Sequence, residues 1–188
     1  MPRAAPYERE QVVRRATDWF WRHGYHRTSI RDLLRVTGFN RRALYAHFGG
    51  KAGLFAAALD DYRVRYIERI VGLLEAPGAG LDALRDLFRL RLGGDPARGC
   101  LIMNTLSEQP DRDLQALAAE QNARIEAGVR RCIVTAQGVG DIAAHRDPDA
   151  LARHVMTLLH GIGPVTRAGM RGEALADMVS ELLEGLAT

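Results

Sequence analysis

The sequence predicts an all-α protein, and three observations support that fold class. Apolar residues recur every three or four positions through nearly the whole chain, which is the spacing of one helix face. The 19 glycines gather between these apolar runs, where helices end. No stretch alternates apolar and polar residues for long enough to predict a β-sheet. We therefore expect about nine helices, with periods near 3.6 residues, and no sheet.

The first two expected helices precede a tight turn. The first spans residues 8–23 and ends at Gly24, and its apolar face consists of Val12, Val13, Ala16, Trp19, Phe20 and His23. Thr28 is a suitable N-cap for a second helix of about nine residues, because its hydroxyl can accept a backbone N–H bond. Gly38 ends that helix, since glycine readily adopts the left-handed backbone conformation.

A third short helix follows this turn directly. Asn40 is placed to cap it, and Leu44 and Phe48, four residues apart, share its inner face. Gly49 and Gly50 end it. One longer helix followed by two short helices around a glycine turn is typical of a helix-turn-helix module, in which the last helix reads DNA.

Six more helices are expected after the module. A longer fourth helix starts at Lys51 and runs to about Ala76, where the Pro77–Gly78 pair closes it. The remaining apolar runs begin at Leu81, Leu101, Leu114, Leu151 and Leu175. Each of these runs predicts one more helix.

Composition excludes several classes of protein. A chain of 188 residues with 47% apolar and 26% charged residues is neither disordered nor collagen-like. Two cysteines 32 positions apart fit no disulfide scaffold or metal site, and the N-terminus has no apolar signal segment, so we expect a cytoplasmic protein. The apolar stretch 155–165 is too short for a membrane span.

The charge is unevenly distributed. Residues 1–55 hold 11 basic and 4 acidic side chains, a balance of +7, whereas the remaining 133 residues have a balance of −4. A basic end of this kind indicates contact with a polyanion such as nucleic acid. A solvated basic surface is the alternative from charge alone. Arg3 is a candidate minor-groove arm or part of a disordered tail.

The residues from position 24 to position 54 resemble the DNA-binding region of TetR-family (tetracycline-repressor-like) regulators. The marks occur in order: Gly24, Thr28, Val36-Thr37-Gly38, Leu44-Tyr45, His47-Phe48, Lys51 and Leu54. The resemblance covers roughly residues 8–66. This chain departs from the family pattern at Gly50 and Ala52, which weakens the cap of the fourth helix, and at Asn40, which replaces the commoner serine.

The resemblance implies a set of DNA contacts. Thr28 would cap its helix and touch a phosphate, and Arg41 and Arg42 would read guanine edges. The sequence leaves open whether both arginines are phosphate clamps instead, and whether Tyr45 and His47 only pack. The full expected DNA-binding set is Thr28, Asn40, Arg41, Arg42, Tyr45, His47 and Lys51.

The family resemblance also implies two domains and a homodimer. Residues 1–50 would form the DNA-binding domain, and residues 51–188 a ligand-binding and dimerisation domain. The last two apolar runs suit four-helix packing between subunits, although ordinary core packing is the alternative. The expected interface residues are Leu151, Val155, Leu158, Leu159, Leu175, Met178, Val179, Leu182 and Leu183.

The segment 98–108 resembles a Gly-Cys-Leu…Asn…Glu stretch of one branch of these regulators. Its polar side chains four residues apart are candidate ligand contacts, with the bracing of neighbouring helices as the alternative. The expected ligand-binding residues are Cys100, Met103, Asn104, Glu108 and His154. Cys100 is either a packing residue or a sensor of oxidants and electrophiles.

Together these patterns predict a DNA-binding transcriptional regulator. We expect a repressor that binds a palindromic operator as a homodimer and is released by a small-molecule effector, with the signal passing through the fourth helix. An activator, a redox sensor acting through Cys100 and a ligand-free architectural protein are the alternatives. An enzyme that uses the helical body, with an acid such as Glu108, is the remote alternative, but no phosphate loop, metal-ligand cluster or nucleophile motif supports it, and we expect no cofactor and no metal.

Overall fold

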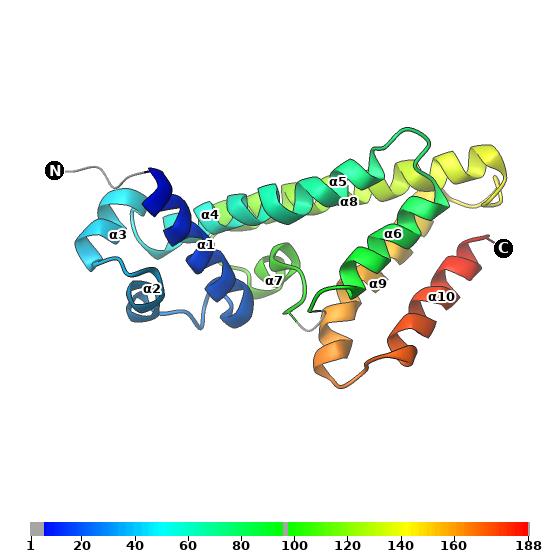
Figure 1. Cartoon of the computed structure of the whole chain (residues 1–188). Coiled ribbons are helices and arrows are strands. Elements are labelled where there is room, and N and C mark those ends of the chain that lie inside the picture. The colour runs from blue at the N-terminus through cyan, green and yellow to red at the C-terminus, as the bar shows by residue number, and fades with distance from the viewer. Residues whose placement is uncertain (1–5, 96–97, 188) are drawn as a thin grey trace. The chain divides into compact units, whose positions relative to one another are not determined.

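The protein is all-α, as the sequence predicts. A computed structural model describes residues 6–95 and 98–187, which contain ten α-helices, one π-helical segment and no strand (Figure 1). Three of these segments, α4 (Lys51–Tyr62), η1 (Arg63–Ile67) and α5 (Glu68–Leu74), follow one another without a break. The described residues therefore form nine continuous helical stretches, the expected number. Arg3 lies outside the described residues.

The chain divides into two compact units. The described residues of the first come from Met1–Tyr66 and Leu101–Gln121, and those of the second from Ile67–Cys100 and Asn122–Thr188. The boundary predicted at residue 50 falls inside the first unit. We keep residues 1–50 as a proposal for the part that reads DNA, and the compact unit around them is larger.

The first unit packs five helices around an aromatic core: α1 (Pro6–His23), α2 (Ile30–Thr37), α3 (Arg41–Phe48), α4 and α7 (Leu101–Glu108). Helix α1 packs against α2 and α4, α3 packs against α4, and α7 packs against α1 and α4. Phe20 and Phe55 meet edge to face, with ring centroids 4.7 Å apart, and both are fully buried. Burial of such a ring contributes about 1.5–3 kcal/mol.

The second unit contains the remaining helices. Helix α10 packs against α9 and α6, and α5 packs against α6 (Figure 1). Ion pairs join α5 to α8, from Glu68 to Arg124 at 2.9 Å and from Glu75 to Arg131 at 2.7 Å. Helix α8 begins in the first unit and continues in the second. The bounds of these four helices are α6 (Leu81–Leu92), α8 (Arg112–Val139), α9 (Pro148–Arg167) and α10 (Glu173–Ala187).

Most of the predicted dimer-interface residues lie in the core of their own chain. The side chains of Leu151, Val155, Leu159, Leu175, Val179 and Leu183 are buried within the single subunit. A buried side chain has little surface left for a partner, so these six residues serve the core of the single subunit, and their part in an interface stays a prediction. Leu158, Met178 and Leu182 are only half-buried and keep surface for a second subunit.

Two local predictions in the first unit need correction. His23 was expected on the inner face of α1, but it is exposed and stacks on Trp19 at 3.8 Å between ring centroids. Thr28 was expected to cap α2, but the cap is Ser29, one residue later. None of the helices in residues 6–95 and 98–187 has the length and apolar character that a membrane span needs.

Candidate nucleic-acid interface

Helix α3 separates its apolar and polar residues cleanly. Leu44 and Phe48 are buried, while Arg41 and Arg42 in the first turn are exposed. Asn40 caps the helix, since its side-chain oxygen accepts a 2.8 Å bond from the Ala43 N–H. The side chain of Asn40 thus satisfies the helix terminus, and the exposed first turn presents two cations together with the positive end of the helix dipole.

Tyr45 extends the exposed face of α3 by one turn. It is 49% exposed, and one side of its ring lies against Gly50. A Cβ atom at position 50 would come within 3.2 Å of the ring, and the φ of +125° there strongly favours glycine. The glycine at position 50, where this chain departs from the family pattern, therefore leaves room for the Tyr45 ring.

Gly53 is a packing position beside the candidate interface that the sequence analysis missed. A Cβ atom there would overlap the carbonyl oxygen of Phe48, the last residue of α3. The first turn of α4 can approach α3 this closely only because position 53 has no side chain. The available signal was a glycine inside a predicted helix, which usually indicates a packing reason.

His47 and Lys51 lie at the C-terminal side of α3. The His47 ring is half-buried, with its centroid 5.6 Å from that of Phe39. The Lys51 ammonium lies 4.2 Å above the centre of the Tyr25 ring. Partial burial lowers the pKa of Lys51, and the negative charge of Glu108 opposes that shift. A cation held against an aromatic face in this way has a restricted position.

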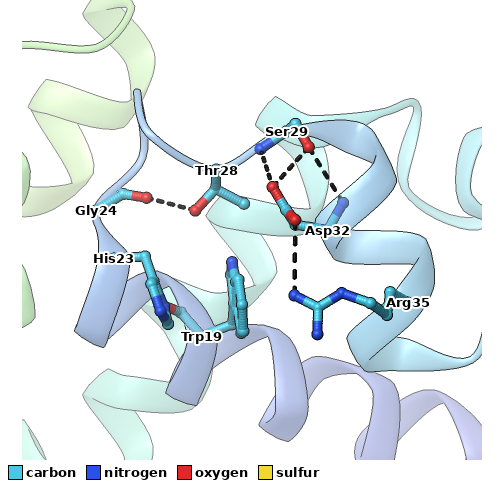
Figure 2. Close-up of polar contacts among 7 residues, drawn as sticks. All are labelled: Trp19, His23, Gly24, Thr28, Ser29, Asp32 and Arg35. Carbon is cyan, nitrogen blue, oxygen red and sulfur yellow. Dashed lines mark hydrogen bonds and ion pairs between the residues drawn. The ribbon is translucent and has the colours of Figure 1, made fainter.

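The start of α2 is built by a reciprocal cap (Figure 2). The Asp32 N–H donates to the Ser29 hydroxyl at 3.2 Å, and the Asp32 carboxylate accepts from the Ser29 N–H at 3.1 Å. The Ser29 hydroxyl also donates to the carboxylate, and these bonds lower the pKa of Asp32. The whole arrangement satisfies backbone groups at the helix N-terminus.

Thr28 has a different role from the one predicted. Its side chain is 2% exposed, and its hydroxyl donates a 2.6 Å bond to the Gly24 carbonyl (Figure 2). The Thr28 N–H donates to the Tyr25 carbonyl. Thr28 therefore closes the loop between α1 and α2, residues 24–28, and its hydroxyl is engaged by the Gly24 carbonyl.

The predicted ligand-binding residues do not all belong to one compact unit. Met103, Asn104 and Glu108 are half-buried on α7 in the first unit, whereas Cys100 and His154 belong to the second. His154 is exposed, and the Glu108 carboxylate accepts a backbone N–H bond from the α1–α2 loop. His154 and Glu108 therefore do not share one apolar site within a single unit.

Comparison with known proteins identifies the family. The family model described as "Bacterial regulatory proteins, tetR family" matches residues 12–58, and one described as "Tetracyclin repressor-like, C-terminal domain" matches residues 80–182. This chain belongs to the TetR family. The first match covers the helix-turn-helix module, so the resemblance inferred from the residues is confirmed. TetR-family proteins of this kind are transcriptional regulators rather than enzymes.

Individual TetR-family relatives match over nearly their whole length. The HTH-type transcriptional repressor ComR of Escherichia coli K12 is 29% identical over 184 residues, covering 94% of this chain and 88% of ComR. The uncharacterized HTH-type regulator YezE of Bacillus subtilis 168 is 32% identical, covering 82% of this chain and 84% of YezE. A cysteine variant of the TetR-family regulator CifR, solved with 26-bp operator DNA, is 28% identical with a TM-score of 0.80 and 99% coverage of both chains.

Proposed function

We propose that this protein binds double-stranded operator DNA as a homodimer and represses transcription until a small-molecule effector releases it. The observation that carries the proposal is the division of α3 into a buried face and an exposed face with Arg41 and Arg42 in the first turn. A single helix fits the major groove of B-DNA, and its N-terminal residues then meet base edges.

The proposed DNA contacts follow from the exposed side chains of α3 and from the half-buried side chains beside them. Arg41 and Arg42 would meet base edges or phosphates, and Tyr45, His47 and Lys51 would bind the phosphate backbone beside the groove. Asn40 would position the first turn of α3 through its cap. Thr28, whose hydroxyl is bonded to the Gly24 carbonyl, would act on the phosphate backbone through the loop that it closes at the start of α2.

Two relatives support the DNA and repressor parts of the proposal. CifR was solved in complex with operator DNA, and it aligns with this chain over 99% of both sequences. ComR, at 29% identity, is a transcriptional repressor. A DNA-binding repressor of bacterial genes would act in the cytoplasm, where its operator is.

The homodimer is proposed on geometric grounds. One short reading helix contacts few base pairs, and two-fold pairing doubles those contacts and requires a palindromic site. Helices α9 and α10 keep the half-buried Leu158, Met178 and Leu182 available for a partner. The interface would therefore use these residues rather than the buried ones first expected.

The effector site is proposed on α7 within the first compact unit, with the half-buried Met103 and Asn104 as its candidate contacts and the fourth helix as the route to the DNA-binding residues. By linkage, an effector releases DNA only as far as it binds the DNA-incompetent state more tightly. A cysteine-based sensor is the second candidate, because Cys100 is partly exposed directly before α7.

The experiment selects genomic fragments of the source organism with purified protein and then titrates the recovered duplex by fluorescence anisotropy. We expect one enriched palindromic sequence and an affinity for it about a thousandfold above that for random duplex. Equal affinity for both duplexes at several salt concentrations would contradict sequence-specific regulation and favour an architectural role. Loss of binding on titration with candidate metabolites would then identify the effector.

A further inference from the structure

Helix α7 ends on the loop between α1 and α2. The Glu108 carboxylate accepts a 2.9 Å bond from the His26 N–H, and the His26 Nε2 lies 3.0 Å from the Glu108 carbonyl oxygen. Both residues belong to the first compact unit, although they are 82 positions apart in the sequence. One residue of α7 therefore contacts both the backbone and the ring of His26.

The loop is shaped to receive this carboxylate. Gly24 has a φ of +81°, and a Cβ atom at this position would overlap Oε1 of Glu108. Glycine thus meets two requirements at once, a left-handed backbone and room for a carboxylate oxygen. Its N–H is already bonded to the Phe20 carbonyl, so the loop leaves α1 in one defined direction.

The same loop leads directly to the DNA-binding elements. Thr28 closes it through bonds to Gly24 and Tyr25, and the next residue, Ser29, caps α2. The Tyr25 ring lies under the Lys51 ammonium at the start of α4. A displacement of the loop would therefore change the start of α2 and the support of a proposed phosphate contact together.

We propose that Glu108 is a positioning residue for DNA binding, which acts by holding the 24–28 loop in the arrangement that α2 and Lys51 need. This inference rests on the proposed function. Glu108 touches no DNA in this assignment, and the hydrogen bond that its carboxylate accepts from the His26 N–H holds the loop. A neutral amide with an oxygen acceptor would keep the bond from His26, whereas a methyl group would lose it.

The test compares Glu108→Gln and Glu108→Ala in the full-length protein, with the selected genomic duplex and random duplex as probes. We expect Glu108→Ala to weaken binding to the selected duplex about tenfold, because the acceptor of the His26 N–H bond is lost. Glu108→Gln should retain binding within about threefold of the wild-type affinity. Glu120→Ala is the matched control, since Glu120 is exposed on α8 and its loss removes the same charge.

A double-mutant cycle separates positioning from general destabilisation. Gly24→Ala should weaken binding more in the wild-type background than in the Glu108→Ala background, because in the latter no carboxylate remains to be displaced. Additive effects, or equal losses for Glu108→Gln and Glu108→Ala, would overturn the inference. If the wild-type protein itself prefers no duplex, the proposed function fails instead, so the two failures are distinguishable.

Discussion

Within residues 1–50, the part proposed to read DNA, some side chains face solvent and others cap or brace the helices. Arg41 and Arg42 are exposed on α3, whereas Asn40 and Ser29 use their side chains to satisfy helix termini. Such caps contribute about 0.5–2 kcal/mol each. The exposed group determines what the helix binds, and the capping group determines where the helix begins.

Arg42→Ala tests direct base reading. If Arg42 makes a bidentate contact with a guanine, its loss should weaken binding to the selected duplex by about 1–3 kcal/mol and leave random duplex nearly unchanged. Anisotropy titrations of both duplexes at one salt concentration measure the difference. Equal losses on the two duplexes would instead make Arg42 a phosphate clamp. Arg153→Ala, an exposed arginine on α9, controls for lost positive charge.

The two cysteines should differ in reactivity. Cys132 is fully buried, its Sγ lies 3.4 Å from the Leu74 carbonyl oxygen, and burial raises the pKa of its thiol. Since the thiolate is the nucleophile, a raised pKa leaves even less of it at pH 7. We expect N-ethylmaleimide to label Cys100 first, with labelling of Cys132 slow and faster at higher pH, as followed by intact-mass spectrometry. Preferential labelling of Cys132 in folded protein would contradict this assignment.

At the scale of elements, close approach between helices depends on particular glycines. Helix α4 begins two residues after Gly49 and turns back against α3, where Gly53 meets the Phe48 carbonyl. The π-helical segment Arg63–Ile67 then separates α4 from α5, which the apolar spacing alone did not predict. The packing of α3 on α4 therefore holds α3, the proposed DNA-reading helix, in place within the first compact unit.

Gly53→Ala should destabilise the first compact unit. The added methyl group would overlap a backbone oxygen that has no free rotation, and overpacking of this kind costs about 1–3 kcal/mol. Urea unfolding followed by circular dichroism measures the loss in free energy of unfolding. Gly72→Ala is the matched control, because Gly72 lies in α5 with open space around it and should gain about 0.5–1 kcal/mol. A neutral result at position 53 would show that α3 and α4 pack less closely.

At the scale of the whole molecule, regulation would need two subunits. Leu182 and Met178 lie four residues apart on α10, half-buried in the single chain, beside the buried Leu183 and Val179. They extend the apolar core of the second unit to its surface. A second copy of the same face would cover them, as two-fold pairing of helices does in helical dimers.

Leu182→Glu should weaken the proposed homodimer. A carboxylate placed in an apolar interface without a partner is desolvated at a cost of several kcal/mol, so the dimer dissociation constant should rise at least about a hundredfold. Light scattering over a tenfold dilution series measures it. Ala176→Glu, exposed on α10, adds the same charge as a control. A wild-type protein that is monomeric at micromolar concentration would contradict the interface.

The sequence predicted local features well and non-local ones poorly. Gly24, Gly38 and Gly49 end helices where the pattern placed those ends, and Asn40 caps α3 as expected. The cap of α2 was misplaced by one residue, because Thr28 and Ser29 are both good caps and only a tertiary bond to Gly24 engages Thr28. The caps and the exposed first turn of α3 were thus predictable from local sequence, whereas the burial of six candidate dimer residues in their own chain depends on tertiary packing.

By itself, the sequence determined the all-α class, the order of the helices and the basic face of α3, because these depend on spacing, caps and charge within a few residues. Only the tertiary structure decided that Glu108 holds the loop of His26, that Gly53 meets Phe48 across a helix junction and which side of α10 is internal. Such contacts join residues from different helices, and in the Glu108 bond residues 82 positions apart. A local sequence pattern does not specify which distant helix a given helix contacts, because that contact depends on how all the helices of the unit pack together.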